Sequence, residues 1–219
     1  GVGVDNVDVP AATQRGVLVV NPPEGNTIAA AEHALAMLLS VSRHVPQAHG
    51  SMRSGAWDRK KYVGNELYKK ILGVVGLGKI GSHVARVAKA MGMDVIAFDP
   101  FISAERAQQM QVRLTTLEAL FQQSDYITLH IPRTPDTENL VNAELLRTMK
   151  STARIVNCAR GGIVDEPAIA EAIESGVIAG AGLDVFASEP LAKDSPLRAV
   201  ERGLVLTPHL GASTEEAQE

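Results

Sequence analysis

The sequence is poor in cysteine, in aromatic residues and in long apolar runs. Its 219 residues include one cysteine and only 4% aromatic residues. The single Cys158 excludes an internal disulfide and a zinc site made of several cysteines, and it is typical of a reducing compartment such as the cytoplasm. No run approaches the roughly 20 apolar residues of a membrane span, and no signal-peptide pattern opens the chain, so we expect no membrane partner.

An excess of positive charge is also missing. The chain has 21 Lys and Arg against 25 Asp and Glu, a formal net charge of −4. Proteins that bind nucleic acid through its phosphates need a basic surface, so we expect no nucleic-acid partner. The composition is otherwise ordinary, with 45% hydrophobic residues, and the length is sufficient to bury a core.

Short apolar runs alternate with amphipathic segments along the chain. Uninterrupted apolar runs are typical of strands that are covered on both faces, and the alternation favours a doubly wound parallel α/β sheet. In such sheets, ligands bind at the carboxyl ends of the strands. The predicted strands lie within residues 16–20, 71–76, 94–99, 126–131, 153–157, 180–186 and 204–207.

Several helix starts can be predicted from capping residues. Thr115 with Glu118, and Ser213 with Glu216, match the capping box, in which side chains bind the free N–H groups of a first helical turn. Residues 165–167 (Asp-Glu-Pro) form another start signal, because proline is tolerated in the first turn.

The most informative segment is GVVGLGKIGSHVARVAKAMGMDVIAFDP, at residues 73–100. Gly76, Gly78 and Gly81 form the pattern G-x-G-x-x-G directly after a predicted strand. The first glycine permits a tight turn, the second lets a pyrophosphate approach the backbone, and the third lets the helix pack closely on the strand. N–H groups at the start of the helix then face the anion. Together these features predict a dinucleotide-binding domain of the Rossmann type.

An acidic residue completes this unit. Asp99 ends the second strand, 23 residues after Gly76 (99 − 76), where a carboxylate binds the ribose hydroxyls of adenosine. Its charge would repel a 2′-phosphate, and neither Pro100 nor Phe101 offers a cation to receive one. We therefore expect NAD rather than NADP. The competing interpretation, that the glycines only form a turn and Asp99 only caps a loop, is disfavoured by the complete strand–helix–strand context.

Three charged residues follow predicted strands at this same edge: Arg160, Glu189 and His209. A guanidinium binds a carboxylate through two hydrogen bonds. Histidine is suited to proton transfer near neutral pH, and a nearby carboxylate orients an imidazole. Taken singly, the three could be a surface ion-pair residue, a structural histidine and a solvated carboxylate. Their shared position favours a catalytic trio. Cys158 is expected to be a small buried residue rather than a nucleophile, and no histidine spacing predicts a metal site.

Several ordered motifs are similar to those of one known family. They are GLGKIG, HIPRTPDTENLVN, IVNCARGGIVDE, AGLDVFASEP and TPHLGAST. The chain resembles, almost end to end, the D-isomer-specific 2-hydroxyacid dehydrogenase family. The resemblance implies NAD-dependent hydride transfer from C2 of a small D-2-hydroxyacid, most closely 3-phospho-D-glycerate, with Arg160, Glu189 and His209 as the catalytic trio.

The resemblance also implies a set of cofactor contacts. Val2 and Ile131 depart from residues common in the family, and we expect both to contact the cofactor through the backbone. The full set comprises Val2, Gly76, Gly78, Lys79, Ile80, Gly81, Asp99, Ile131, Pro132, Cys158, Ala159, Arg160, Asp184, His209, Gly211 and Ala212.

The expected organisation is one NAD-binding domain over residues 1–219. It divides into a hinge and edge strand at 1–24, one long helix of the dimerisation type at 25–50, and the dinucleotide-binding core at 68–212. The helix over 27–43 is apolar around most of its circumference, which fits a core helix or, as the resemblance implies, the interface of a homodimer or higher homo-oligomer. The family's substrate domain is expected to lie outside this chain, so that isolated turnover would be poor.

Three other functions are compatible with the same residues. A glyoxylate/hydroxypyruvate reductase or a D-lactate dehydrogenase would share the fold, trio and cofactor. An NAD-sensing, corepressor-like binding protein would share the fold without the chemistry, and the intact trio argues against it. An NADP-dependent reductase is opposed by Asp99.

Overall fold

The computed structural model describes residues 7–20 and 25–218. Within them lies a seven-stranded sheet of order β3-β2-β1-β4-β5-β6-β7, in which every neighbouring pair is parallel. The doubly wound parallel sheet is therefore confirmed. The strands are β1 (Ile71–Val75), β2 (Asp94–Phe98), β3 (Arg113–Leu114), β4 (Tyr126–Leu129), β5 (Arg154–Asn157), β6 (Gly180–Leu183) and β7 (Leu204–Leu206).

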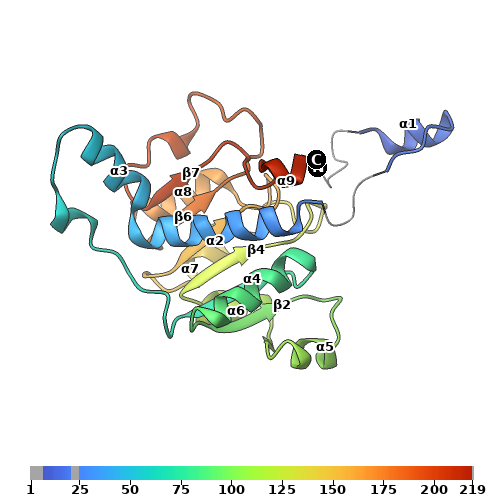
Figure 1. Cartoon of the computed structure of the whole chain (residues 1–219), viewed down its shortest axis with the longest axis horizontal. Coiled ribbons are helices and arrows are strands. Elements are labelled where there is room, and N and C mark those ends of the chain that lie inside the picture. Colours follow the sequence, from blue (N-terminus) through green and yellow to red (C-terminus); the bar gives the residue numbers. More distant parts are fainter. Residues whose placement is uncertain (1–6, 21–24, 219) are drawn as a thin grey trace.

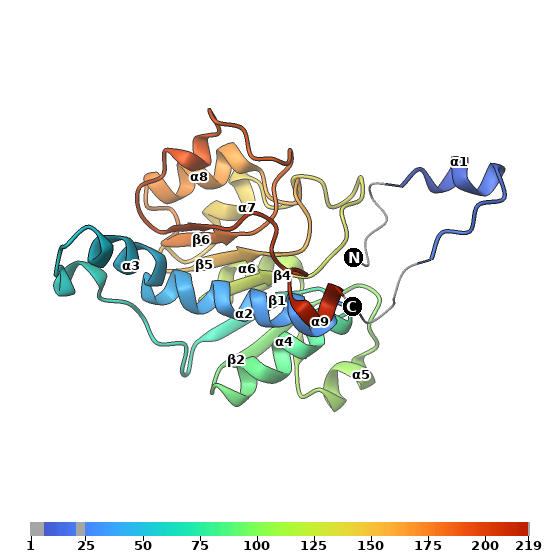
Figure 2. The ribbon, with the colours of Figure 1, turned by 45° about the horizontal axis from the view of Figure 1, so that its top comes forward.

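Helices cover both faces of the sheet (Figures 1 and 2). The helices α2 and α4 pack together on one face, and α6, α7 and α8 pack on the other. The helices are α1 (Val9–Gln14), α2 (Thr27–Arg43), α3 (Val45–Arg53), α4 (Lys79–Ala90), α5 (Ala104–Gln109), α6 (Leu117–Gln123), α7 (Ala143–Arg147), α8 (Glu166–Glu174) and α9 (Glu215–Gln218), with short 3₁₀ turns at Arg59–Tyr62 and Pro196–Arg198. No helix in the described part of the chain is long and apolar enough to cross a membrane.

Each face of the sheet carries its own apolar core. On one face, Leu38 and Val41 of α2 pack with Val84 and Ala88 of α4, all of them buried. On the other, Phe121 of α6 belongs to a second buried cluster with residues of α7 and α8. Each fully buried large aliphatic or aromatic side chain contributes about 1.5–3 kcal/mol. The two layers hold the sheet rigid and leave the ends of its strands free for ligands.

The helix predicted over residues 27–43 has these bounds, but the longer segment at 25–50 is not one helix. The chain breaks at His44, which has a left-handed φ of 55°, and α3 begins at Val45. Pro46 has no N–H and cannot bond to the carbonyl of Ser42, the residue four positions earlier. That carbonyl instead accepts a hydrogen bond from Asn65 N at 3.0 Å.

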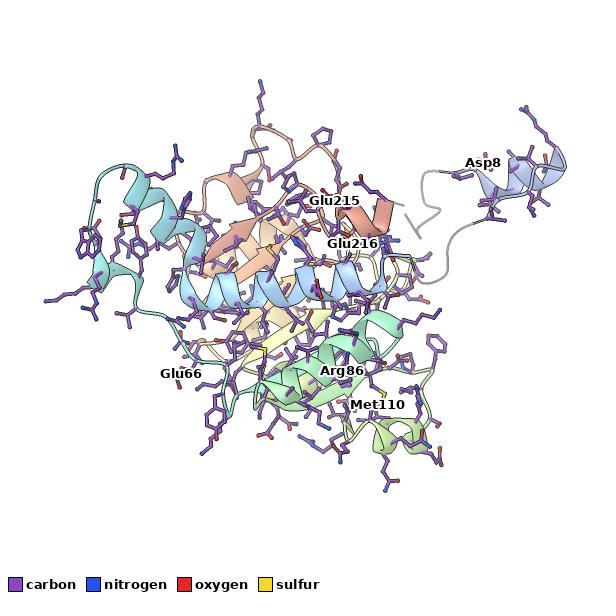
Figure 3. The ribbon with its side chains drawn as sticks, in the orientation of Figure 1. Asp8, Glu66, Arg86, Met110, Glu215 and Glu216 are labelled. Carbon is purple, nitrogen blue, oxygen red and sulfur yellow. The ribbon has the colours of Figure 1, made fainter. Side chains whose placement is uncertain are left out.

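The strand predicted at residues 16–20 is not present. Residues 17–20 have no strand pairing, and Leu18 is 85% exposed. This segment and α1 lie apart from the sheet, as the position of Asp8 at the start of α1 shows (Figure 3). The run is apolar, but among residues 7–20 and 25–218 no strand lies beside it to complete a ladder. The remainder of the expected hinge, at residues 1–6 and 21–24, falls outside the described residues.

Two predicted caps are displaced by one residue. The N-cap of α6 is Thr116, whose hydroxyl accepts from Ala119 N, because Thr115 N still bonds to Ala97 O of the sheet. In the same way Thr214, rather than the predicted Ser213, accepts from Ala217 N at the start of α9. Asp165 caps α8 as predicted, with proline in the first turn.

Candidate active site at the carboxyl edge of the sheet

The strands β4 to β7 end level with one another. Leu129 is paired with Asn157, Asn157 with Leu183, and Leu183 with Leu206. Because the strands are parallel, the residues that follow them emerge at one edge. This edge therefore receives the polar positions that the sequence placed after separate strands, which are His130, Cys158, Asp184 and Thr207.

The glycine loop lies at the same edge, between β1 and α4. Gly76 has φ +94°, and a Cβ there would lie 2.6 Å from His130 O; a Cβ on Gly81 would lie 1.9 Å from Gly76 O. The turn and the close packing expected of these two glycines are present. At Gly78 a Cβ would meet nothing within 4 Å, and α4 begins there without a side-chain cap. Open space and uncapped N–H groups fit a bound pyrophosphate.

Asp99 follows β2 and is held by the backbone. Its Oδ2 accepts from Leu77 N at 2.7 Å, and its Oδ1 accepts from Phe101 N at 2.9 Å. The bond to Leu77 ties the carboxylate to the glycine loop itself. Each oxygen keeps a lone pair, so the group can still accept hydrogen bonds from ribose hydroxyls. Its fixed negative charge at this end of the loop suits NAD.

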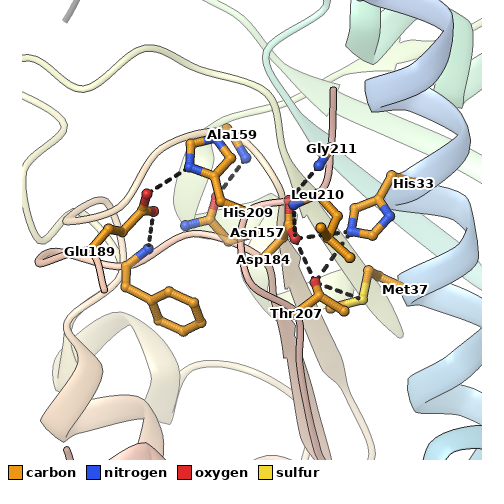
Figure 4. Close-up of polar contacts among 11 residues, drawn as sticks. His33, Met37, Asn157, Ala159, Asp184, Glu189, Thr207, His209, Leu210 and Gly211 are labelled. Atoms are coloured by element: carbon orange, nitrogen blue, oxygen red, sulfur yellow. Dashed lines mark hydrogen bonds and ion pairs between the residues drawn. The ribbon is translucent and has the colours of Figure 1, made fainter. Parts of the chain in front are cut away.

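His209 and Glu189 form a hydrogen-bonded pair (Figure 4). Nδ1 of His209 lies 2.7 Å from Oε2 of Glu189. The second carboxylate oxygen, Oε1, accepts from Phe186 N at 3.0 Å, which holds the acid in place. His209 has a left-handed backbone with φ 55°, and its own N–H donates to the carbonyls of Asp184 and Thr207. The imidazole is thus oriented through Nδ1, which leaves Nε2 for proton transfer.

Arg160 sits on a turn that Asn157 holds from both sides. The amide Nδ2 of Asn157 donates to Arg160 O at 2.9 Å, and its Oδ1 accepts from Ala159 N at 3.0 Å. Arg160 also donates through Nη1 to Ala159 O. Gly161 follows Arg160 where this turn packs against the loop of Phe186. A Cβ there would lie 1.7 Å from Phe186 O, so close packing of two loops requires the glycine.

Asp184 is fully buried beneath the loop that carries His209. Its Oδ1 accepts from Leu210 N at 2.8 Å and from Thr207 Oγ1 at 2.5 Å, and its Oδ2 accepts from Gly211 N at 2.9 Å. His33 Nε2 lies 3.1 Å from Oδ1. Burial alone would raise the pKa of Asp184, but these donors, His33 foremost, lower it. The carboxylate therefore stays charged and fixes the backbone after His209.

Two further groups at this edge are shifted by burial. Burial, and next the charge of Asp184, raises the pKa of the Cys158 thiol far above its ordinary value. A thiol that stays protonated is no nucleophile, which agrees with the expectation that Cys158 is not catalytic. Burial also lowers the pKa of His130 to about 4, and its Nε2 lies 3.0 Å from Thr128 Oγ1. His130 is therefore neutral at pH 7.

One cleft of about 220 Å³ joins several of these elements. Three lining residues were not predicted: Asn26, Ala30 and His130. Of these, His130 could have been predicted, because it is a polar residue at the end of an apolar strand. Asp184 lies beneath the cleft, Lys79 lines a separate groove outside α4, and Val2 falls outside the described residues. The predicted positions that line the cleft are Ile80, Ile131, Pro132, Cys158, Ala159, Arg160, His209, Gly211 and Ala212.

His209 separates this cleft from a second hollow of about 610 Å³, which Glu189, Phe186, Leu191 and Leu206 help to line. His209 therefore lines the smaller cleft together with Arg160 and Ile80, and it lines the larger hollow together with Glu189. The structure therefore brings the other two members of the predicted trio, Arg160 and Glu189, next to His209.

A parallel sheet with an open glycine loop and an acid after its second strand defines a dinucleotide-binding domain. Residues 35–211 match the family model described as "D-isomer specific 2-hydroxyacid dehydrogenase, NAD binding domain". The chain belongs to this family, and its cofactor is NAD.

Relatives match along the whole chain. It is 64% identical over 218 residues to D-3-phosphoglycerate dehydrogenase of Synechocystis and 52% identical over 219 residues to that of Bacillus subtilis, covering 100% of this chain in both cases but 39% and 41% of the relatives. Among solved structures, TT0316 protein from Thermus thermophilus superimposes with a TM-score of 0.92 at 39% identity, over 100% of this chain and 69% of that one. The chain thus spans about two fifths of the length of these curated relatives.

Proposed function

We propose that this chain is the cofactor-binding domain of an NAD-dependent dehydrogenase that oxidises C2 of 3-phospho-D-glycerate to 3-phosphooxypyruvate, the first step of L-serine biosynthesis. The observation that carries the proposal is the 2.7 Å pair of His209 and Glu189 beside the cleft that Arg160 lines. The relatives named D-3-phosphoglycerate dehydrogenase support the choice of substrate.

Each member of the trio has a distinct task in this proposal. The guanidinium of Arg160 holds the substrate carboxylate as a planar fork, so that C2 faces the cofactor. His209 takes the proton of the C2 hydroxyl on Nε2 as the carbonyl forms. Glu189 keeps the ring in this orientation through Nδ1 and compensates the charge that the imidazole gains. The nicotinamide, when bound, supplies the acceptor for the hydride that leaves C2.

The glycine loop, Asp99 and the cleft residues are proposed to hold the cofactor. The uncapped start of α4 would face the pyrophosphate, and Asp99 the adenosine ribose. Neutral His130 adds no positive charge to the cleft, and among the described residues that line it Arg160 is the one with a permanent positive charge.

The test has two stages that fail separately. Calorimetric titration with NAD and with NADP asks whether the domain binds its cofactor and prefers NAD. Stoichiometric NADH formation is then followed with 3-phospho-D-glycerate, D-glycerate and D-lactate, at protein concentrations comparable with that of NAD so that slow turnover is still detected. We expect NAD binding and the fastest reduction with 3-phospho-D-glycerate. A faster reaction with D-lactate or D-glycerate would overturn the substrate, and failure to bind NAD would overturn the cofactor-binding role.

Assembly and location follow as further parts of the proposal. We propose a homodimer in which exposed apolar residues near α2 and α3, such as Leu39, Val45 and Met52, contribute to the interface; these residues are 41–53% exposed in one chain. Sedimentation of the chain across concentrations tests this part. The unpaired Cys158 is compatible with a reducing cytoplasm, which we propose as the location.

A further inference from the structure

Three side chains beneath the cleft belong to residue types that bind metal ions together. They are His33 of α2, Cys158 after β5 and Asp184 after β6, and the potential ligand atoms of all three lie within 4.8 Å of one another. Figure 4 shows His33 projecting from α2 toward Asp184 and Thr207. The residues are far apart in the sequence, and their spacing did not predict the cluster. The sheet and α2 bring it together.

From this cluster we infer a binding site for one borderline-soft divalent cation of the Zn²⁺ and Co²⁺ class. The donor set would be one imidazole nitrogen, one thiolate sulfur and one carboxylate oxygen. Such a set suits Zn²⁺ and Co²⁺, whereas Mg²⁺ and Ca²⁺ prefer oxygen alone.

Two of the three ligand atoms already have the spacing that a metal ion requires. Ligand atoms around a tetrahedral ion with bonds of about 2.0–2.3 Å lie roughly 3.3–3.6 Å apart. Nε2 of His33 and Oδ1 of Asp184 are already 3.1 Å apart, so an ion can replace the hydrogen bond between them. The sulfur of Cys158 lies within 4.8 Å of both atoms, and rotation of its side chain has to close the remaining gap. The fourth position falls to Thr207 Oγ1, 3.3 Å from His33 Nε2, or to a water from the cleft.

Backbone N–H groups next to the cluster orient the carboxylate of Asp184. Leu210 N and Gly211 N already hold the carboxylate of Asp184, as outer partners of a metal ligand commonly do. On binding, the Cys158 thiol loses its proton to solvent. The proton that His33 Nε2 shares with Asp184 is replaced by the ion and leaves to solvent, while Nδ1 carries the proton of the neutral imidazole.

Binding there would affect the site above. Asp184 fixes the backbone of Leu210 and Gly211, and its carbonyl accepts from His209 N. An ion that draws the carboxylate toward His33 and Cys158 weakens these bonds. It also adds a charge beside the cleft that Cys158 and Gly211 line. We expect Zn²⁺ to weaken NAD binding. This consequence rests on the cofactor occupying that cleft, whereas the metal site itself does not.

The single cysteine makes the test direct. Co²⁺ bound to a thiolate gives a near-ultraviolet charge-transfer band, and in this chain only Cys158 can produce it. We expect the band to saturate at one Co²⁺ per chain, to disappear on addition of Zn²⁺, and to be lost in Cys158→Ser. His33→Ala should weaken Co²⁺ binding at least tenfold. His83→Ala, which removes a histidine of α4 outside the cluster, should leave it unchanged.

A second measurement needs no variant and guards against misfolding of the substituted chains. Zn²⁺ at saturating concentration should slow the reaction of Cys158 with a thiol reagent in the unchanged protein, and Mg²⁺ should not. Absence of a thiolate band at millimolar Co²⁺, or a band of full strength in a folded His33→Ala variant, would overturn the site. Weak NAD binding with or without Zn²⁺ would count against the cofactor assignment alone, because the Co²⁺ spectrum does not depend on it.

Discussion

Nδ1 of His209 lies 2.7 Å from Oε2 of Glu189, and the other oxygen of that carboxylate is bonded to Phe186 N. The acid is therefore fixed by two partners, although its side chain is still 36% exposed. His209 is itself fixed by the bonds from its backbone N–H to two carbonyls. A preorganised pair of this kind reduces the reorganisation that proton transfer requires.

Glu189→Gln tests this relationship. The amide keeps the shape but removes the charge that orients the imidazole and stabilises its protonated form. We expect kcat to fall about ten- to a hundredfold, part of the factor of about 10²–10⁴ that a positioned acid–base group contributes, with little change in the Kd for NAD. Glu189→Asp, which keeps the charge, should retain more activity than Gln across the pH profile. Glu174→Gln, at the exposed end of α8, is the control; full kcat in Glu189→Gln at every pH would contradict the role.

Arg160→Lys separates geometry from charge. Lysine keeps the positive charge but cannot form two parallel hydrogen bonds to one carboxylate. Loss of one charge-assisted hydrogen bond costs about 1.5–3 kcal/mol, so we expect KM for the hydroxyacid to rise roughly ten- to a hundredfold. The Kd for NAD should change much less. Arg147→Lys, on the exposed side of α7, serves as the matched control. An unchanged KM would place the substrate carboxylate elsewhere.

The strands of the sheet could be predicted from the sequence, but the contacts between separate elements could not. Every strand from β1 to β7 except β3 was predicted, because buried parallel strands leave apolar runs, and β3 has only two residues. The predicted edge strand at 16–20 failed because a run can be apolar without a neighbour to pair with. The shift from Thr115 to Thr116 as cap was set by a bond to Ala97 in another strand. Such information is tertiary and has no local pattern.

In the candidate site, too, some residues could be predicted from the sequence and others could not. The glycine loop and Asp99 could be predicted because their spacing reflects one strand–helix–strand unit. Asn157, which holds the Arg160 turn, left a weak signal as a polar residue at the tip of an apolar strand. His33 left none, because its position beside Asp184 depends on how α2 crosses the sheet. Residues that hold the functional groups in place are therefore harder to predict than the groups themselves.

Asp99→Asn tests cofactor choice. Asparagine can still accept from Leu77 N through its oxygen, so the tie to the glycine loop should remain, whereas the bond from Phe101 N and the negative charge are lost. We expect the Kd for NAD to rise about tenfold or more, as for the loss of a charged hydrogen-bond partner, and the preference over NADP to shrink. Calorimetric titration with both cofactors measures this. Asp94→Asn, at the exposed start of the same strand, should change neither Kd; an unchanged NAD preference in Asp99→Asn would remove the role of the charge.

His130 links the cleft to stability in acid. Burial lowers its pKa to about 4 from an ordinary 6.5. Between these values the unfolded chain binds a proton that the folded chain does not, so the free energy of unfolding falls as the pH drops from 6.5 toward 4. The complete shift corresponds to about 3 kcal/mol, but the residue is partly exposed at the cleft, and water there reduces the penalty, so we expect about 1–2 kcal/mol.

His130→Gln should remove this part of the acid sensitivity. Glutamine does not titrate and can still bond to Thr128 Oγ1, so the variant should lose less stability than the unchanged chain between pH 7 and pH 4.5, whatever its stability at pH 7. Urea unfolding at both values measures the difference. His83→Gln, on the exposed side of α4, should retain the full acid sensitivity. Equal losses in the His130 variant and the unchanged chain would show that the ring is solvated well enough to be protonated in the folded state.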